Sequence, residues 1–178
     1  FAALHTLIQK TVKEHKRIIF NGNGYDESWI KESAKRGLLN LPSTPDCLKY
    51  MLSEKNIKLF TDFKVLSETE FKARYDVALE NYIKTLRIEA VTMLEMANRD
   101  ILPVVSAYSA ELADAALVKQ HAGADNTFES NRLKLICELE NKIYTSVTEL
   151  SDAVENVPDG YLADKAEHYK TKVLAAMN

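Results

Sequence analysis

The 178-residue sequence is poor in the residues that make tight turns, with five glycines and four prolines. A fold built from many β-hairpins needs more of them, so the composition argues against an all-β protein. The formal net charge of −3 offers no general attraction for nucleic acid or anionic lipid. No apolar run approaches the roughly 20 residues that cross a bilayer, and no signal peptide opens the chain. These absences predict a cytoplasmic globular protein without a nucleic-acid or membrane partner.

Cysteine is also scarce. Cys47 and Cys137 are the only two, and neither belongs to a CxxC or a Cys/His cluster. We therefore predict two buried, reduced thiols, which fits a cytoplasmic protein, while a disulfide between them stays open as the alternative.

What the sequence does contain is helical periodicity, most clearly after residue 66. Ser67 and Glu70 have the spacing of a capping box. Apolar residues then recur at steps of three and four, which predicts one helix as far as His121, about 54 residues or ~80 Å long. Pro103 lies inside it and predicts a kink. The apolar stripe consists of Phe71, Tyr75, Leu79, Tyr82, Leu86, Ala90, Met93, Ala97, Ile101, Val104, Tyr108 and Leu112.

A second long helix is predicted to begin at Asp125 or Asn126, after Gly123 ends the first. The composition of residues 157–160 predicts a turn, and a last helix follows from about Tyr161 to Met177. Two apolar stripes of this length must cover each other, which predicts a long antiparallel helical hairpin or bundle. The second stripe, interrupted only by Glu140, consists of Leu133, Ile136, Ile143, Val147, Leu150, Val154 and Val157.

Shorter helices are predicted before the hairpin. Residues 1–15 have amphipathic spacing, and a helix is expected from about residue 26 to 36, with Gly37 ending it. Further helices are expected from Ser43, whose hydroxyl would cap the first turn, to Leu52, and from Ser53 onward. The chain opens in mid-helix with Phe1 rather than Met, so we expect an N-terminal neighbour to precede it. The predicted fold class is thus all-α, with several short helices before the long hairpin.

The segment from His15 to Trp29 breaks the helical pattern. Arg17–Phe20 is predicted to be a short strand or an extended connector. Asn21–Gly24 partly matches a dinucleotide-binding turn, but Glu27 stands where the third glycine would be, and it and Asp26 would repel a pyrophosphate. We interpret the loop as a sharp turn with residues in left-handed conformations.

No set of residues predicts catalysis or metal binding. His5, His15, His121 and His168 have no partner at metal-ligand spacing, and no GxSxG motif occurs. Acidic residues on the long helix have basic neighbours and predict a solvated or ion-paired face; they are Glu89, Glu95 and Asp100. The residues alone therefore indicate a helical interaction or scaffold protein.

Two blocks of sequence add a family resemblance. HKRIIFNGNGYDESWIKESAKRGLLNL and YIKTLRIEAVTMLEMANRDILP resemble the C-terminal region of bacterial type III glutamine synthetases. Asp26 stands where that family often has Ser, a mild departure at a cap position. The matching residues are Arg17–Tyr25, Trp29, Arg36–Leu38, Asn40, Leu41, Ile88–Ala90, Thr92–Leu94, Met96, Ala97, Arg99 and Ile101–Pro103.

The resemblance implies a parent enzyme that uses ATP to join ammonia to glutamate through a γ-glutamyl phosphate. It implies Mg²⁺ or Mn²⁺ in the parent and stacked rings of identical subunits. The family's metal, ATP and glutamate motifs have no match here, so no catalytic, cofactor-binding or metal residue is assigned to this chain, and the fragment alone is expected to be inactive.

The pattern of elements and the resemblance together predict a domain organisation. By pattern, residues 25–66 are a connector of short helices and residues 67–178 the long helical bundle. The resemblance implies that residues 1–24 would be the C-terminal edge of an absent catalytic domain. The fragment would be structural and would support the oligomer, with Arg17–Trp29 as the seam to the catalytic part. The alternative is a free-standing helical protein-interaction module with only local similarity.

Overall fold

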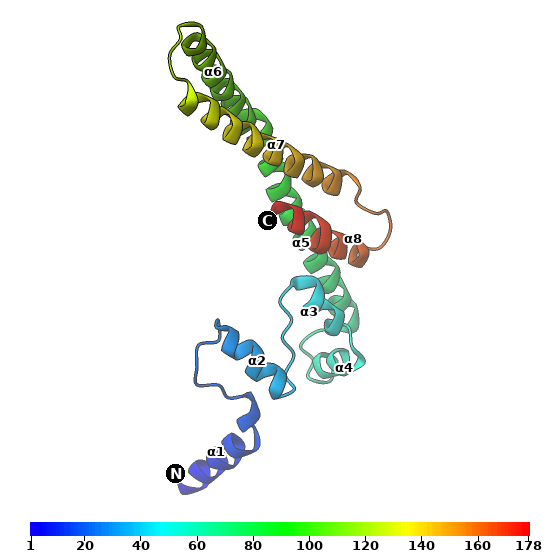
Figure 1. Cartoon of the computed structure of the whole chain (residues 1–178). Helices are drawn as coiled ribbons and strands as arrows, with labels where there is room; N and C mark the ends of the chain where they lie inside the picture. The colour runs from blue at the N-terminus through cyan, green and yellow to red at the C-terminus, as the bar shows by residue number, and fades with distance from the viewer. The chain divides into compact units, whose positions relative to one another are not determined.

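The computed structural model describes all 178 residues, and every regular element in it is a helix (Figure 1). The all-α prediction is confirmed. The chain forms two compact units, Phe1–Pro42 and Ser43–Asn178, which are described separately below.

The first unit contains two α-helices joined by an irregular segment. Helix α1 covers Ala2–Glu14, a 3₁₀ turn (η1) covers Lys16–Ile18, and α2 covers Glu27–Lys35. Gly37 ends α2 with a φ of +70°, and the amides of Gly37 and Leu38 donate to the carbonyls of Ala34 and Ser33. This is the glycine-terminated helix end that the sequence predicts. The predicted strand or extended connector is wrong at Arg17 and Ile18, which lie in the 3₁₀ turn.

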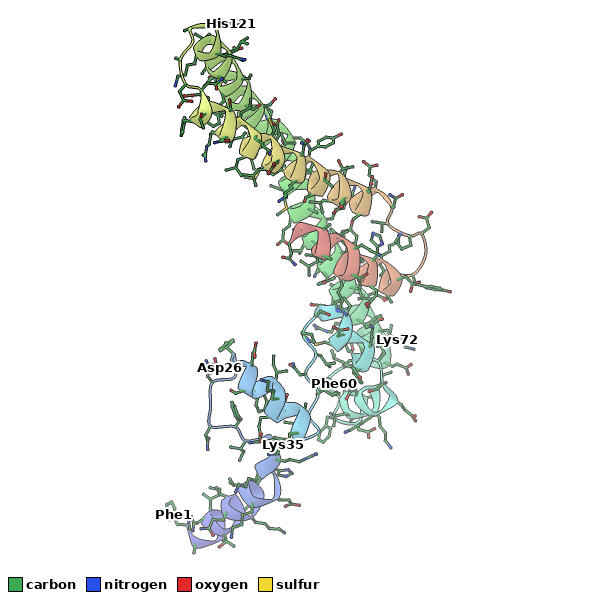
Figure 2. All side chains as sticks on the ribbon, viewed as in Figure 1. Phe1, Asp26, Lys35, Phe60, Lys72 and His121 are labelled. Carbon is green, nitrogen blue, oxygen red and sulfur yellow. The ribbon has the colours of Figure 1, made fainter.

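The second unit begins with two short helices, α3 (Thr44–Met51) and α4 (Glu54–Asp62). The Ser43 hydroxyl accepts a hydrogen bond from the amide of Asp46, as predicted for this cap. The ring of Phe60 at the end of α4 packs against that of Phe71, with 4.8 Å between centroids. This contact joins the short helices to the start of the long one, near the labels Phe60 and Lys72 in Figure 2.

The long helix is continuous from Glu68 to His121, a span of 54 residues. It consists of α5 (Glu68–Met96), a π-helical segment η2 (Ala97–Ile101) and α6 (Leu102–His121). Both hydrogen bonds of the predicted capping box at Ser67 and Glu70 are present.

The π-helical segment changes which face of the helix is buried. The amide of Leu102 donates to the carbonyl of Ala97, five residues back instead of four. Pro103 follows and cannot donate to the carbonyl of Arg99, so a widened turn accommodates the proline ring. The next inward-facing residue after Ala97 is therefore Leu102. The buried or half-buried positions beyond it are Leu102, Val105, Ser109, Leu112, Ala116 and Lys119.

The predicted stripe is consequently correct up to Ala97 and at Leu112, with Met93 as an exception on the exposed side. It is wrong at Ile101, Val104 and Tyr108, which are all exposed. A constant helical repeat was assumed in the prediction, and one extra residue in the turn rotates the rest of the helix.

Helix α7 (Thr127–Glu155) runs back antiparallel along α6 and then reaches α5 (Figure 1). The tip between α6 and α7 is closed by an ion pair of 2.7 Å between Lys119 Nζ and Glu129 Oε1. Asn126 Nδ2 also donates to the carbonyl of Ala116. The predicted stripe is confirmed from Leu133 to Val154, since Leu150 is buried and the others are half-buried. Its last member, Val157, is half-buried but lies beyond the end of α7.

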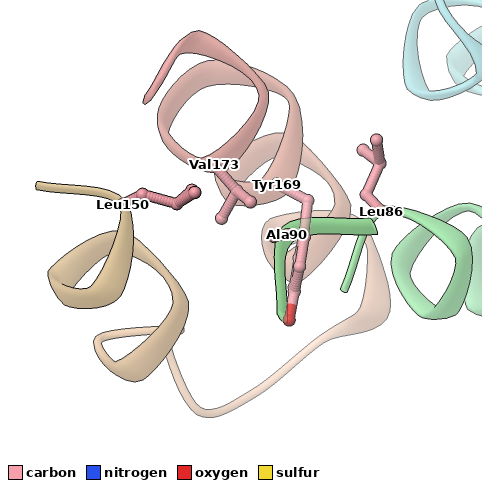
Figure 3. Packing of buried hydrophobic residues seen from close by; sticks show 5 residues of the cluster. All are labelled: Leu86, Ala90, Leu150, Tyr169 and Val173. Atoms are coloured by element: carbon pink, nitrogen blue, oxygen red, sulfur yellow. The ribbon is translucent and has the colours of Figure 1, made fainter. Parts of the chain in front are cut away.

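The C-terminal arm consists of α8 (Leu162–His168), a second π-helical segment η3 (Tyr169–Val173) and α9 (Leu174–Met177). It brings two buried side chains, Tyr169 and Val173, between α5 and α7 (Figure 3). The resulting core cluster comprises Leu86, Ala90, Leu150, Tyr169 and Val173.

Ion pairs join the C-terminal arm to α3. Lys170 Nζ lies 2.7 Å from Asp46 Oδ1, and Lys49 Nζ lies 3.1 Å from Glu167 Oε2. The Ser43 hydroxyl donates to the second carboxylate oxygen of Asp46. Hydrogen bonds from Lys170 and Ser43 hold the pKa of Asp46 below its usual range. Elements more than 100 residues apart in sequence are thereby linked.

Two expectations from composition need correction. Cys47 is exposed rather than buried, Cys137 is half-buried, and no disulfide joins them. The helix Glu68–His121 is also long and apolar enough, by length and composition, to cross a membrane. The expectation that no stretch approaches this property is wrong, although one such helix is weak evidence for a membrane span.

Placing a charge in the core cluster tests this packing. Leu86 is 8% exposed, so Leu86→Asp should lower the free energy of unfolding by about 3 kcal/mol or more, because an unpaired carboxylate would be buried. Ile88→Asp is the matched control on the same helix, since Ile88 is 67% exposed. Urea unfolding measures both, and equal stabilities of the two variants would contradict the packing.

The link between α3 and the C-terminal arm should depend on pH. The folded pKa of Asp46 is depressed, so its stabilising effect is present above the unfolded pKa of about 4 and is lost as the pH falls through the folded value. Asp46→Asn should therefore lower Tm at pH 7, and the difference from the unmodified chain should vanish in acid. Glu95→Gln, which breaks an exposed pair within one helix, should change Tm little at pH 7. Identical Tm values for Asp46→Asn and the unmodified chain at pH 7 would exclude this role.

Candidate interaction surfaces

The irregular segment of the first unit is organised by two aromatic rings. Phe20 and Trp29 lie with ring centroids 4.6 Å apart. Gly22 makes room for this pair, because a Cβ built there would lie 2.4 Å from Cζ of Phe20. A side chain at position 22 would therefore displace the Phe20 ring from its position beside Trp29.

Asn23 closes the loop with its own side chain. Its Nδ2 donates to Asp26 Oδ1 at 2.7 Å, and its Oδ1 accepts from the amide of Tyr25 at 3.1 Å. The predicted left-handed turn is wrong, since neither Gly22 nor Gly24 has a positive φ. The glycine at position 22 is needed for space, and the reversal itself is made by Asn23.

Arg36 fastens the segment to the end of α2. Its guanidinium donates to the carbonyls of Ile19 and Arg17 and to the Glu32 carboxylate. It also lies over the Phe20 ring, 5.9 Å from the centroid. The hydrogen bond from Arg36 lowers the pKa of Glu32. This role of Arg36 was not predicted from the sequence, because a basic residue at the end of a helix indicates only a favourable interaction with the helix dipole.

The Asn/Gly loop does not offer a phosphate cradle. The amides of Tyr25 and Asp26 in the Asn/Gly loop both donate to Asn23, so neither is available to a phosphate. No group of three His, Cys, Asp or Glu side chains could hold a metal ion. Of the acids on the long helix, Glu95 and Asp100 both pair with Arg99.

Uncovered apolar surface is the main feature of the first unit. Its only buried residue is Ser33, and none of its apolar side chains is buried. Leu4, Leu7, Ile8 and Val12 share one face of α1, by their spacing, and all are exposed.

A second apolar surface lies on the outside of α6. Because of the π-helical segment, Ile101, Val104 and Tyr108 share an exposed face, with Val104 at 68% exposure. Val118 extends this surface toward the tip of the hairpin. A helix with apolar residues on both faces is usually covered on both faces.

One known protein family matches most of this chain. Residues 3–120 match the family described as the glutamine synthetase C-terminal domain. The chain belongs to this family. The match covers both apolar surfaces described above, and the predicted resemblance is confirmed.

Three curated relatives are glutamine synthetases. The chain is 34% identical over 175 residues to a glutamine synthetase of Butyrivibrio fibrisolvens, covering 97% of this chain and 25% of that protein. It is 38% identical over 113 residues to a type-3 glutamine synthetase of Dictyostelium discoideum, covering 64% of this chain and 15% of that protein. It is 24% identical over 176 residues to a glutamine synthetase of Bacteroides fragilis (strain YCH46), covering 97% of this chain and 24% of that protein. The chain thus spans a quarter or less of the length of each relative.

Fluorescence can test the packing of Phe20 against Trp29 in this glutamine synthetase C-terminal domain, because Trp29 is its single tryptophan. Gly22→Ala should displace Phe20 from Trp29, shift Trp29 emission to longer wavelength and increase its quenching by acrylamide. Gly24→Ala is the matched control, because nothing lies within 4 Å of a Cβ at that position. Identical spectra for the two variants would contradict the spatial role of Gly22.

Proposed function

We propose that this chain is the C-terminal helical part of a glutamine synthetase and that it is itself non-catalytic. Its role is to brace the catalytic part of the same polypeptide and to support contacts between sister subunits in a homo-oligomer. The observation that carries the proposal is the first unit, which has no buried apolar side chain of its own.

The surface chemistry of α1 supports this role. Burial of apolar surface contributes about 25 cal/mol per Å², so a face made of Leu4, Leu7, Ile8 and Val12 is stabilised only when another surface covers it. Two long-range hydrogen bonds of Arg36 hold the adjacent segment in a fixed shape. Arg17–Trp29 is then the preorganised seam against the catalytic part, and residues 1–24 form the edge of that part.

The reaction belongs to the whole enzyme. The family and its relatives support ATP-dependent ligation of ammonia to glutamate with Mg²⁺ or Mn²⁺, carried out in the cytoplasm by residues outside this chain. Within the proposal, residues 25–66 connect the edge to the bundle of residues 67–178, and the outer face of α6 is a candidate contact between subunits.

Activity measurements on two proteins test the proposal. The full-length polypeptide should form glutamine from glutamate, ammonia and ATP, and the 178-residue chain should not. Removal of residues 67–178 from the full-length polypeptide should disturb its oligomer and lower its activity. A full-length polypeptide without this activity, or a truncated one with native assembly and rate, would overturn the proposal and favour a free-standing interaction module.

A point substitution tests the seam more finely. Leu7 is 60% exposed, so Leu7→Glu should leave the Tm of the 178-residue chain within a few degrees of the unmodified value, since surface changes cost about 0.5 kcal/mol or less. In the full-length enzyme the same change should lower Tm and activity, because it would bury an unpaired charge. Gln9→Glu adds the same charge to the polar side of α1 and should have little effect in either protein. Equal effects of the two substitutions in the full-length enzyme would contradict a covered α1.

A further inference from the structure

A cleft of about 610 Å³ lies within the second unit, between α5 and the C-terminal arm. One wall is a single face of α5 that carries Lys84 and Arg87, and the opposite wall is α8 with Lys165. Its volume falls within the range of small-molecule sites, which is about 300–1,000 Å³. The remaining lining residues are Glu80, Ile83, Val154, Val157, Pro158, Asp159, Leu162 and Tyr169.

Some of the charged side chains in this cleft have an ion-pair partner and others have none. Lys84 Nζ pairs with Glu80 Oε2 at 2.8 Å, which neutralises the acid on the α5 wall. Arg87 and Lys165 come from opposite walls and make no ion pair. Asp159 is the one remaining acid and is exposed in the loop before α8. Two unpaired cations thus face one space from two elements.

The lining of the cleft also includes apolar side chains. Ile83, Val157 and Leu162 are half-buried, and the ring of Tyr169 is anchored in the core cluster. Burial raises the pKa of Tyr169, and the positive charge of Arg87 acts in the opposite direction.

The geometry points to a binding site for a small organic oxyanion, with a carboxylate or phosphate group held between Arg87 and Lys165 and an apolar portion against Ile83 and Leu162. A guanidinium offers paired donors to either kind of oxyanion, and a lysine adds a point charge from the other wall. Such a ligand would bridge α5 and α8 and so stabilise the packing of the C-terminal arm on α5.

Calorimetric titration of the 178-residue chain tests this site. The probes are succinate and inorganic phosphate, each compared with sodium chloride at matched ionic strength so that general screening is subtracted. We expect saturable binding of at least one probe. The probe that binds more tightly distinguishes a carboxylate site from a phosphate site.

Three variants assign the binding to the cleft. Arg87→Gln and Lys165→Gln should each weaken it by about tenfold or more, the usual effect of losing a charge-assisted hydrogen bond. Lys134→Gln is the matched control, an exposed cation on α7 that does not line the cleft. Should Arg87→Gln fail to fold, Arg87→Lys keeps the charge and should still weaken binding through loss of the paired donors. Absence of saturable binding, or equal weakening by Lys134→Gln, would overturn the site.

Discussion

The hydrogen bond from the amide of Leu102 to the carbonyl of Ala97 determines how the long helix meets its neighbours. This bond spans five residues because Pro103 cannot continue the normal ladder, and it rotates everything beyond it by one position. Leu112 and Ala116 then face α7, while Ile101, Val104 and Tyr108 face outward. A single backbone constraint therefore decides both the packing of the hairpin and the position of its uncovered apolar face.

Features that depend on local chemistry could be predicted from the sequence. The capping box at Ser67, the cap at Ser43 and the glycine end at Gly37 each involve residues within a few positions of one another, and each is confirmed. The α7 stripe is also confirmed, because no proline or glycine interrupts its repeat. Features that depend on how side chains pack in three dimensions could not be predicted from such local patterns. The composition around Gly22 predicts a left-handed turn, yet glycine is needed there because the ring of Phe20 leaves no space for a Cβ. Arg36 acts on carbonyls 17 and 19 residues away, which no spacing rule reveals.

The two units differ in how many apolar side chains each buries by itself. The unit Ser43–Asn178 has core clusters around Leu86 and Leu79 and ion pairs that join its beginning to its end. The unit Phe1–Pro42 has a well-fastened aromatic pair but no buried apolar side chain. The chain belongs to the glutamine synthetase C-terminal domain family and matches only a quarter or less of each relative. The proposed contact of α1 with the rest of a synthetase would account for the apolar surface that this unit leaves exposed.

Hydrogen exchange of residues 1–42 is the most direct test of this account. It should be measured once in the 178-residue chain and once in the full-length synthetase, at the same pH and temperature. Under the proposal that the rest of the enzyme covers the apolar face of α1, the amides of α1 should exchange readily in the 178-residue chain and be strongly protected in the full-length enzyme. Equal exchange of α1 in the two proteins would contradict this proposal.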